Sequence, residues 1–165
     1  MTITGDIAES YRAPGRVVRR KLANGQREER ALATLMGACG MAFVAQWPAL
    51  ARAAHLNPDV PLDARMGGAL MGAIFLLPLL AYGLAALSHL VAKAMGGQGG
   101  WFGARLALFW ALLAISPLML LQGLVAGLVG PGPALSAVGF VVLAGFLWLW
   151  LGGLRAAEGF GKQAA

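Results

Sequence analysis

Residues 66–92 read MGGALMGAIFLLPLLAYGLAALSHLVA, a run without Asp, Glu, Lys or Arg. About 20 apolar residues are enough for a helix to cross a hydrocarbon core of about 30 Å. The run therefore predicts a membrane span that is long enough to tilt, bend or enter the interface. Three more apolar runs lie at 31–50, 102–129 and 134–154. None alternates with a period of two residues, which indicates helices and not barrel strands.

The composition points to the same class of protein. Of the 165 residues, 59% are hydrophobic and 12% are charged, whereas a typical soluble domain has about 25% charged residues. This excludes an ordinary soluble enzyme and a disordered chain, and a single cysteine excludes a disulfide-stapled domain. The sequence predicts an all-α fold, a polytopic transmembrane bundle of four spans within residues 31–154. A basic cytoplasmic or interfacial segment (1–30) with short helices precedes the bundle, and a short cytoplasmic tail (155–165) follows it.

The basic residues predict how the spans are oriented. Only Arg52 and Arg65 of the 13 Lys and Arg residues fall on one side of the predicted membrane, and the rest, Lys162 included, fall on the other. Because basic residues near short loops are retained on the cytoplasmic side, both termini are expected to be cytoplasmic. The competing interpretation is a cleaved signal peptide, with Ala49-Leu50-Ala51 as the cleavage site. The long polar stretch before the first span argues against cleavage.

The first 30 residues predict two short helices. Asp6 and Glu9 have the spacing of a capping box. After Pro14-Gly15, a second helix over 16–23 would carry Val17 and Val18 on one side, flanked by four basic residues that are candidates for anionic-lipid contact: Arg16, Arg19, Arg20 and Lys21. The alternative is a plain topology signal with solvated side chains. A nucleic-acid partner is not expected, because the basic residues are not interleaved with aromatic ones.

The sequence contains few residues that could carry out a catalytic mechanism. None of the four spans contains an acidic residue, and His55 and His89 fall on opposite sides of the predicted membrane. Cys39, in the first span, is expected to be a small packing residue. We therefore predict no catalytic residue, no metal site and no cofactor, and we predict that the protein is not an enzyme. A lipid-modifying activity that depends on His89 is a weaker alternative.

The polar and helix-breaking residues within the spans leave two interpretations open. Tyr82, His89 and Gln122, with Gln46, are expected to make interhelical contacts. Alternatively, Tyr82, His89 and Gln122 line the path of a small transporter whose spans bend at two prolines, Pro78 and Pro117. Pairs of glycines four residues apart predict faces for close helix packing or partner binding: Gly68 with Gly72, and Gly123 with Gly127.

One ordered set of motifs resembles a known family. It comprises Tyr82-Gly83, Ser88-His89-Leu90, a glycine-rich joint at 96–100, Arg105 and Ser116-Pro117, with Pro14 and Glu28-Glu29-Arg30-Ala31 near the N-terminus. The pattern resembles the bacterial branch of the Yip-domain (Ypt-interacting-protein-like) membrane family. The resemblance implies a multi-spanning helical domain with a cytoplasmic N-terminus and no catalytic or metal-binding residues.

Two departures limit what the resemblance implies. The family usually has about five spans, whereas this sequence predicts four. The acidic N-terminal signature with tyrosine and glycine, found in the eukaryotic members that bind small GTPases, is missing, so GTPase binding is not carried over. The leading prediction is a non-catalytic accessory, scaffolding or membrane-organising protein in a bacterial inner membrane. Its expected partners are lipids, other transmembrane proteins or a second copy of itself.

Overall fold

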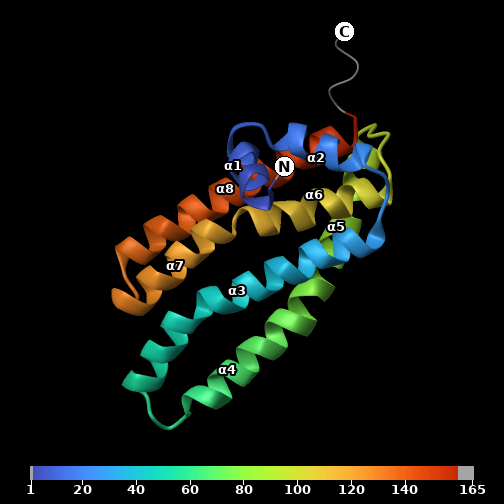
Figure 1. The fold of residues 1–165 in the computed structure, drawn as a ribbon. Helices are drawn as coiled ribbons and strands as arrows, with labels where there is room; N and C mark the ends of the chain where they lie inside the picture. Colours follow the sequence, from blue (N-terminus) through green and yellow to red (C-terminus); the bar gives the residue numbers. More distant parts are fainter. Residues whose placement is uncertain (1, 160–165) are drawn as a thin grey trace.

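The fold is a bundle of long helices with two short helices laid across it (Figure 1). The computed structural model describes residues 2–159, so Lys162 and the rest of the predicted tail after Gly159 lie outside the described residues. No strand occurs within residues 2–159. The elements are α1 (Ile3–Arg12), α2 (Pro14–Ala23), α3 (Glu28–Leu56), α4 (Leu62–Met71), the π-helical turn η1 (Gly72–Leu76), α5 (Leu77–Ala94), α6 (Trp101–Ala114), α7 (Ser116–Leu128) and α8 (Pro133–Ala157).

Four stretches of helix correspond to the four predicted spans. Three of them are long and apolar enough to cross a membrane individually, namely α3, the continuous Leu62–Ala94 and α8. The pair α6 and α7 is bent by 44° at the break between them, and it brings the number of candidate spans to four when the pair is taken as one. The helices extend past the predicted limits of the runs at 31–50 and 134–154, because α3 begins at Glu28 and α8 continues to Ala157.

The two prolines that were predicted to bend their spans lie beside two kinds of irregularity. In a regular α-helix, the ring of a proline clashes with the carbonyl of the residue four positions earlier, which for Pro78 is Ile74. Ile74 lies in the turn η1, just before the helix that contains Pro78. Pro117 follows the break between α6 and α7. There the amides of Leu118 and Met119 both donate to the Ile115 carbonyl, at 3.0 and 3.1 Å.

The long helices are arranged side by side, with α6 and α7 in the middle (Figure 1). α8 packs on one side of α6 and α7, and α3 packs on the other. α4 and η1 pack on the outer side of α3, while α5 reaches α6. The fully buried core side chains include Phe109 and Leu108 of α6 and Leu35 of α3. Between membrane helices, close van der Waals packing of this kind replaces the hydrophobic drive of a soluble core.

The outer surfaces of the spans are strongly apolar. Large side chains such as Leu79 and Phe140 are 70% and 73% exposed. A soluble protein would not leave so many large apolar side chains uncovered, whereas hydrocarbon is their natural solvent. The prediction of a multi-pass transmembrane helical bundle is therefore confirmed.

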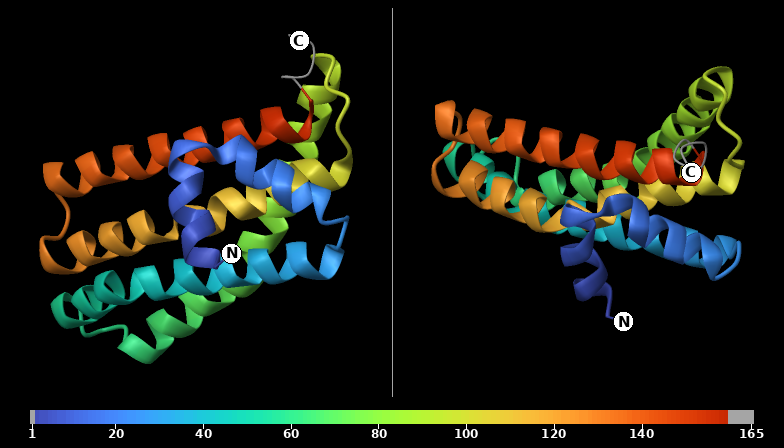
Figure 2. Two further views of the ribbon diagram at one scale, coloured as in Figure 1. Left: turned by 45° about the horizontal axis from the view of Figure 1, so that its top comes forward. Right: turned by 90° about the horizontal axis from the view of Figure 1, so that it is seen from above.

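The N-terminal helices α1 and α2 lie across α6 and α8 (Figure 2). The predicted capping box is wrong, because α1 begins earlier, at Ile3, and the hydroxyl of Thr2 accepts the Gly5 amide at 3.4 Å. Asp6 lies inside the helix and is buried. α2 begins at Pro14, which occupies a first-turn position where its missing N–H is not needed.

Candidate functional site

A buried hydrogen bond joins Glu158, at the end of α8, to His89 in the last turns of α5. Nδ1 of His89 lies 2.7 Å from Oε1 of Glu158, and the two side chains are only 4% and 0% exposed. The other carboxylate oxygen of Glu158 accepts the Gly99 amide at 3.1 Å, and its backbone carbonyl accepts the Gln98 amide at 2.9 Å. His89 is therefore a hydrogen-bonded residue at a helix junction.

The glycine-rich joint at 96–100 allows this close approach. A Cβ added at Gly97 would lie 2.9 Å from both the Ala92 carbonyl oxygen and a carboxylate oxygen of Glu158. The ring of Trp101 covers His89, with the ring centroids 4.4 Å apart. The predicted tail at 155–165 includes Glu158, and the enclosure of this residue by the loop and α5 was not predicted from the sequence.

Tyr82, His89 and Gln122, which the transporter alternative places along one path, lie in three different places. Tyr82 packs edge-on against Phe109 with centroids 5.0 Å apart. His89 is enclosed with Glu158, and Gln122 borders a cleft elsewhere in the bundle. The structure does not assemble these three side chains into one polar lining.

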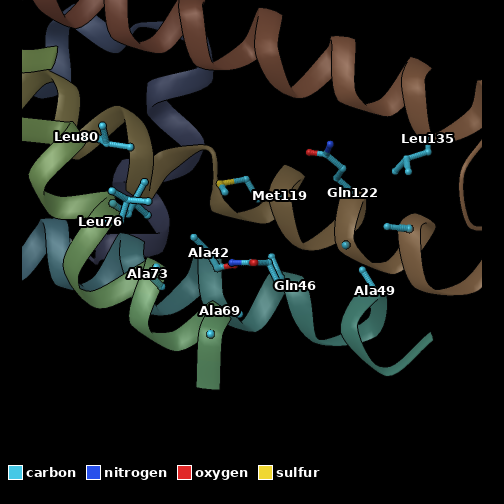
Figure 3. A pocket seen from close by; sticks show the side chains of 16 residues that line it. Ala42, Gln46, Ala49, Ala69, Ala73, Leu76, Leu80, Met119, Gln122 and Leu135 are labelled. Atoms are coloured by element: carbon cyan, nitrogen blue, oxygen red, sulfur yellow. The ribbon is translucent and has the colours of Figure 1, made fainter. Parts of the chain in front are cut away.

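That cleft is an open, mainly apolar hollow of about 660 Å³ between α3, the α4–η1–α5 span and α7 (Figure 3). Small residues make up much of its wall, among them Ala42, Gly68 and Gly72. Two carboxamides border it, Gln46 from α3 and Gln122 from α7. The Gln46 side chain donates to the Ala42 carbonyl of its own helix at 3.2 Å.

The two predicted glycine pairs have different surroundings. A Cβ at Gly123 would collide with the backbone carbonyl of Ala45, and one at Gly127 would collide with Pro48. These two glycines therefore allow α7 to pack tightly on α3. By contrast, a Cβ at Gly68 or Gly72 would meet nothing within 4 Å. That face of α4 and η1 is free for contacts beyond the described chain.

The basic residues of α2 are held partly by the acids of α1. Arg20 pairs with Asp6 at 2.6 Å and with Glu9 at 2.9 Å, and Lys21 pairs with Asp6 at 3.1 Å. The Lys21 ammonium also lies 3.9 Å from the centre of the Trp110 ring. Burial alone would raise the pKa of Asp6, but hydrogen bonding and charge from Lys21 and Arg20 outweigh it and hold that pKa below its ordinary value of 3.8.

The apolar side of α2 is covered by protein and not by lipid. Val17 and Val18 are buried in the core cluster with residues of α6 and α8, so a helix resting its apolar side on a membrane surface is not the arrangement found. Arg16 faces outward, with 71% of its side chain exposed and Glu9 at 3.8 Å. Of the four basic residues considered for lipid contact, Arg20 and Lys21 are engaged within the hairpin.

The hairpin of α1 and α2 also satisfies polar groups around the bend of the third span. The Tyr11 hydroxyl donates to the Ala114 carbonyl at 2.8 Å, next to the break between α6 and α7. The Trp110 indole donates to the Ser10 hydroxyl at 2.8 Å, and Ser10 donates in turn to the Asp6 carbonyl at 2.7 Å. A carbonyl freed by a helix break is costly in a membrane unless a donor reaches it.

Some of these contacts were not predicted from any pattern in the sequence. Glu158 lies beyond the last apolar run, and Ser10 and Tyr11 lie about 100 positions from their partners. Arg52 donates to the Gly127 and Leu128 carbonyls at the end of α7, at 3.3 and 3.4 Å. A clue for Glu158 was available, since an acid shortly after a span can fold back onto a histidine near the end of a neighbouring span.

Comparison with known proteins identifies a family. The sequence model of the Yip1 domain matches residues 8–165. No curated protein and no solved structure matches the chain significantly. The matched region includes all the spans and most of the N-terminal hairpin, and an all-helical, multi-pass architecture fits it. The chain therefore belongs to the Yip1 domain family.

Proposed function

We propose that this protein is a non-catalytic, membrane-organising or accessory component that acts through helix–helix and lipid contacts. The observation that carries the proposal is the open small-residue face on the second span. None of the residues of α4, Leu62–Met71, is buried, and α4 packs only on α3 and η1 within the described chain. Gly68 and Gly72 lie on this half-span with free space above them.

The contrast between the two glycine pairs supports this proposal. Gly123 and Gly127 are used for packing inside the chain, whereas Gly68 and Gly72 are not. Small residues let two helix backbones approach closely in a membrane, where tight packing drives association. The carboxamides of Gln46 and Gln122, at the neighbouring cleft, offer hydrogen bonds to a helix that docks there.

The lipid part of the proposal rests on the basic end of the bundle. Here we define the basic end as α1, α2, the joint at 96–100 and the end of α8. Arg16 and Arg19 are the residues of α2 that we propose for contact with anionic headgroups, since Arg20 and Lys21 pair with Asp6. We also propose that this end faces the cytoplasm of a bacterial inner membrane. We propose no binding of small GTPases and no bound cofactor.

Purification tests the proposal directly. The tagged protein would be extracted in mild detergent, and its native mass and co-purifying chains would be measured for the wild type and for Gly68→Leu/Gly72→Leu. We expect a stable complex or oligomer for the wild type and a folded monomer for the double variant. Gly40→Leu is a matched control, because Gly40 is also an open helix glycine. A monomeric wild type, or a double variant that assembles normally, would contradict the proposal.

A further inference from the structure

A second hollow lies at the basic end, between α5 and α8. The two helices both pack on α6, but they do not pack on each other within the described chain. The space between them is a groove of about 640 Å³. Its lining includes Leu84, Leu87, Val91 and Met95 from the α5 side and Leu151, Leu154 and Arg155 from α8.

The walls of this groove suit a flexible chain better than a helix. Most of the lining side chains are large, such as Leu87, Val91 and Leu151, so they keep the backbone of another helix at a distance. By contrast, the cleft that borders Gly68 and Gly72 is lined largely by small residues, which let another helix approach closely. An acyl chain can follow an irregular apolar surface of this kind, and Leu87 and Val91 are already exposed to whatever fills it.

The length of the groove matches one leaflet of a bilayer. From Leu84 to Met95 the helix α5 rises about 16 Å, at about 1.5 Å per residue. This is about half of the hydrocarbon thickness of about 30 Å. The groove therefore reaches from the basic end to about the middle of the membrane, which is the depth that a single acyl chain occupies.

The charge at the mouth of the groove indicates which lipid would bind. Arg155, in the last turn of α8, has an exposed side chain and lines the groove beside Leu154 and Met95. The nearby Glu158 is bound to His89, and Arg155 takes part in none of the ion pairs among residues 2–159. An arginine in this position can pair with a phosphate through two parallel hydrogen bonds.

We infer that the α5–α8 groove binds one acyl chain of an anionic phospholipid, whose headgroup phosphate pairs with Arg155. This goes beyond the proposed function, because the groove lies on a different face from the open glycines of α4 and η1. Loss of helix docking at Gly68 and Gly72 would leave lipid binding at the groove unchanged. Likewise, loss of lipid binding at the groove would leave helix docking at Gly68 and Gly72 unchanged.

Native mass spectrometry of the full-length protein tests the inference. The protein would be equilibrated in mixed micelles with phosphatidylglycerol or phosphatidylcholine, and the retained lipids would be counted. We expect one phosphatidylglycerol to be retained in preference to phosphatidylcholine. Arg155→Gln should weaken this preference about five-fold, which corresponds to one basic residue near an anionic surface. Leu87→Trp, which fills the groove, should reduce retention of both lipids.

Two controls keep the result specific. Arg27→Gln removes another exposed arginine, between α2 and α3, that has no proposed lipid contact, and it should leave the count unchanged. Inorganic phosphate should not displace the lipid, because the apolar groove contributes most of the binding. Equal retention of the two lipids by the wild type would overturn the inference. An Arg155→Gln protein that binds as the Arg27→Gln protein does would also overturn it, as would a Leu87→Trp protein with normal retention.

Discussion

At the residue scale, the side chain of Glu158 determines how the end of α8 is attached to α5. This side chain is fully enclosed, so its hydrogen bonds to His89 and to the Gly99 amide replace those to water. A buried polar group that loses its partner is strongly unfavourable. The pair therefore fixes where α8 ends relative to α5.

Replacing Glu158 is expected to destabilise the bundle. Glu158→Ala should lower the free energy of unfolding in detergent by about 3 kcal/mol, because it removes one partner of a buried pair. Glu29→Ala, at an exposed position at the start of α3, should change it by less than about 0.5 kcal/mol. A double-mutant cycle with His89→Ala would measure the coupling, and equal effects of Glu158→Ala and Glu29→Ala would show that the pair contributes nothing.

The glycines make a second prediction at this scale. Gly123→Ala places a methyl group on the Ala45 carbonyl, so α3 and α7 must separate, at a cost of about 1–3 kcal/mol. Gly72→Ala meets open space and should be neutral or slightly stabilising, because alanine is the better helix former. Thermal unfolding of the two variants in the same detergent would compare them. A Gly123→Ala protein as stable as Gly72→Ala would refute the close contact.

At the scale of elements, the hairpin of α1 and α2 behaves as one unit. The carboxylates of α1 hold the basic side chains of α2, and Val17 and Val18 are buried with residues of α6 and α8. Tyr11 and Ser10 join the hairpin to α6 through hydrogen bonds near the bend. The bend is therefore stabilised by contacts from outside its own span.

The ion pairs of Asp6 with Arg20 and Lys21, here called the Asp6 clamp, make the stability of the hairpin depend on pH. Since the pKa of Asp6 is lower in the folded protein than its ordinary value of 3.8, the clamp contributes its full stability above that value. The contribution is lost as the pH falls through the folded-state pKa. The unfolding free energies of the wild type and Asp6→Asn should therefore differ most at pH 7 and converge below about pH 4. A difference that stays constant with pH would contradict this.

At the scale of the whole molecule, α2 and the end of α8 lie together at one end of the bundle (Figure 2). Most of the basic residues gather at that end, while Arg52 and Arg65 lie near the opposite one. The positive-inside rule then predicts that this end is cytoplasmic.

Reporter fusions would check the orientation. A phosphatase that is active only outside the cytoplasm should be active when inserted within residues 57–61, the turn between α3 and α4, and inactive when fused after Ala165. A reporter that works only in the cytoplasm should show the reverse pattern. Phosphatase activity after Ala165 would mean that the number of crossings is odd.

The sequence predicted the spans well because lipid exposure leaves a simple signal, an uninterrupted apolar run. It predicted bends at both Pro78 and Pro117 but could not distinguish the two, because both prolines lie in equally apolar surroundings. In the structure the chain breaks at Ile115, before Pro117, whereas Pro78 follows a π-helical turn in a continuous helix. Nor could it predict that Gly123 is covered while Gly68 is open. That difference depends on which helices become neighbours, which is a property of the tertiary fold.

The position of the hairpin has a consequence for biogenesis. α1 and α2 precede α6 and α8 in the chain, yet the surface that receives them is formed by α6 and α8. Tyr11 can form its hydrogen bonds only after its partners have been made. Its hydroxyl donates to the Ala114 carbonyl, and the Trp148 indole donates to the Tyr11 carbonyl at 3.2 Å. Val17 and Val18 are fully covered only when both α6 and α8 are in place. Docking of the hairpin therefore depends on the insertion of α8, the last helix among residues 2–159.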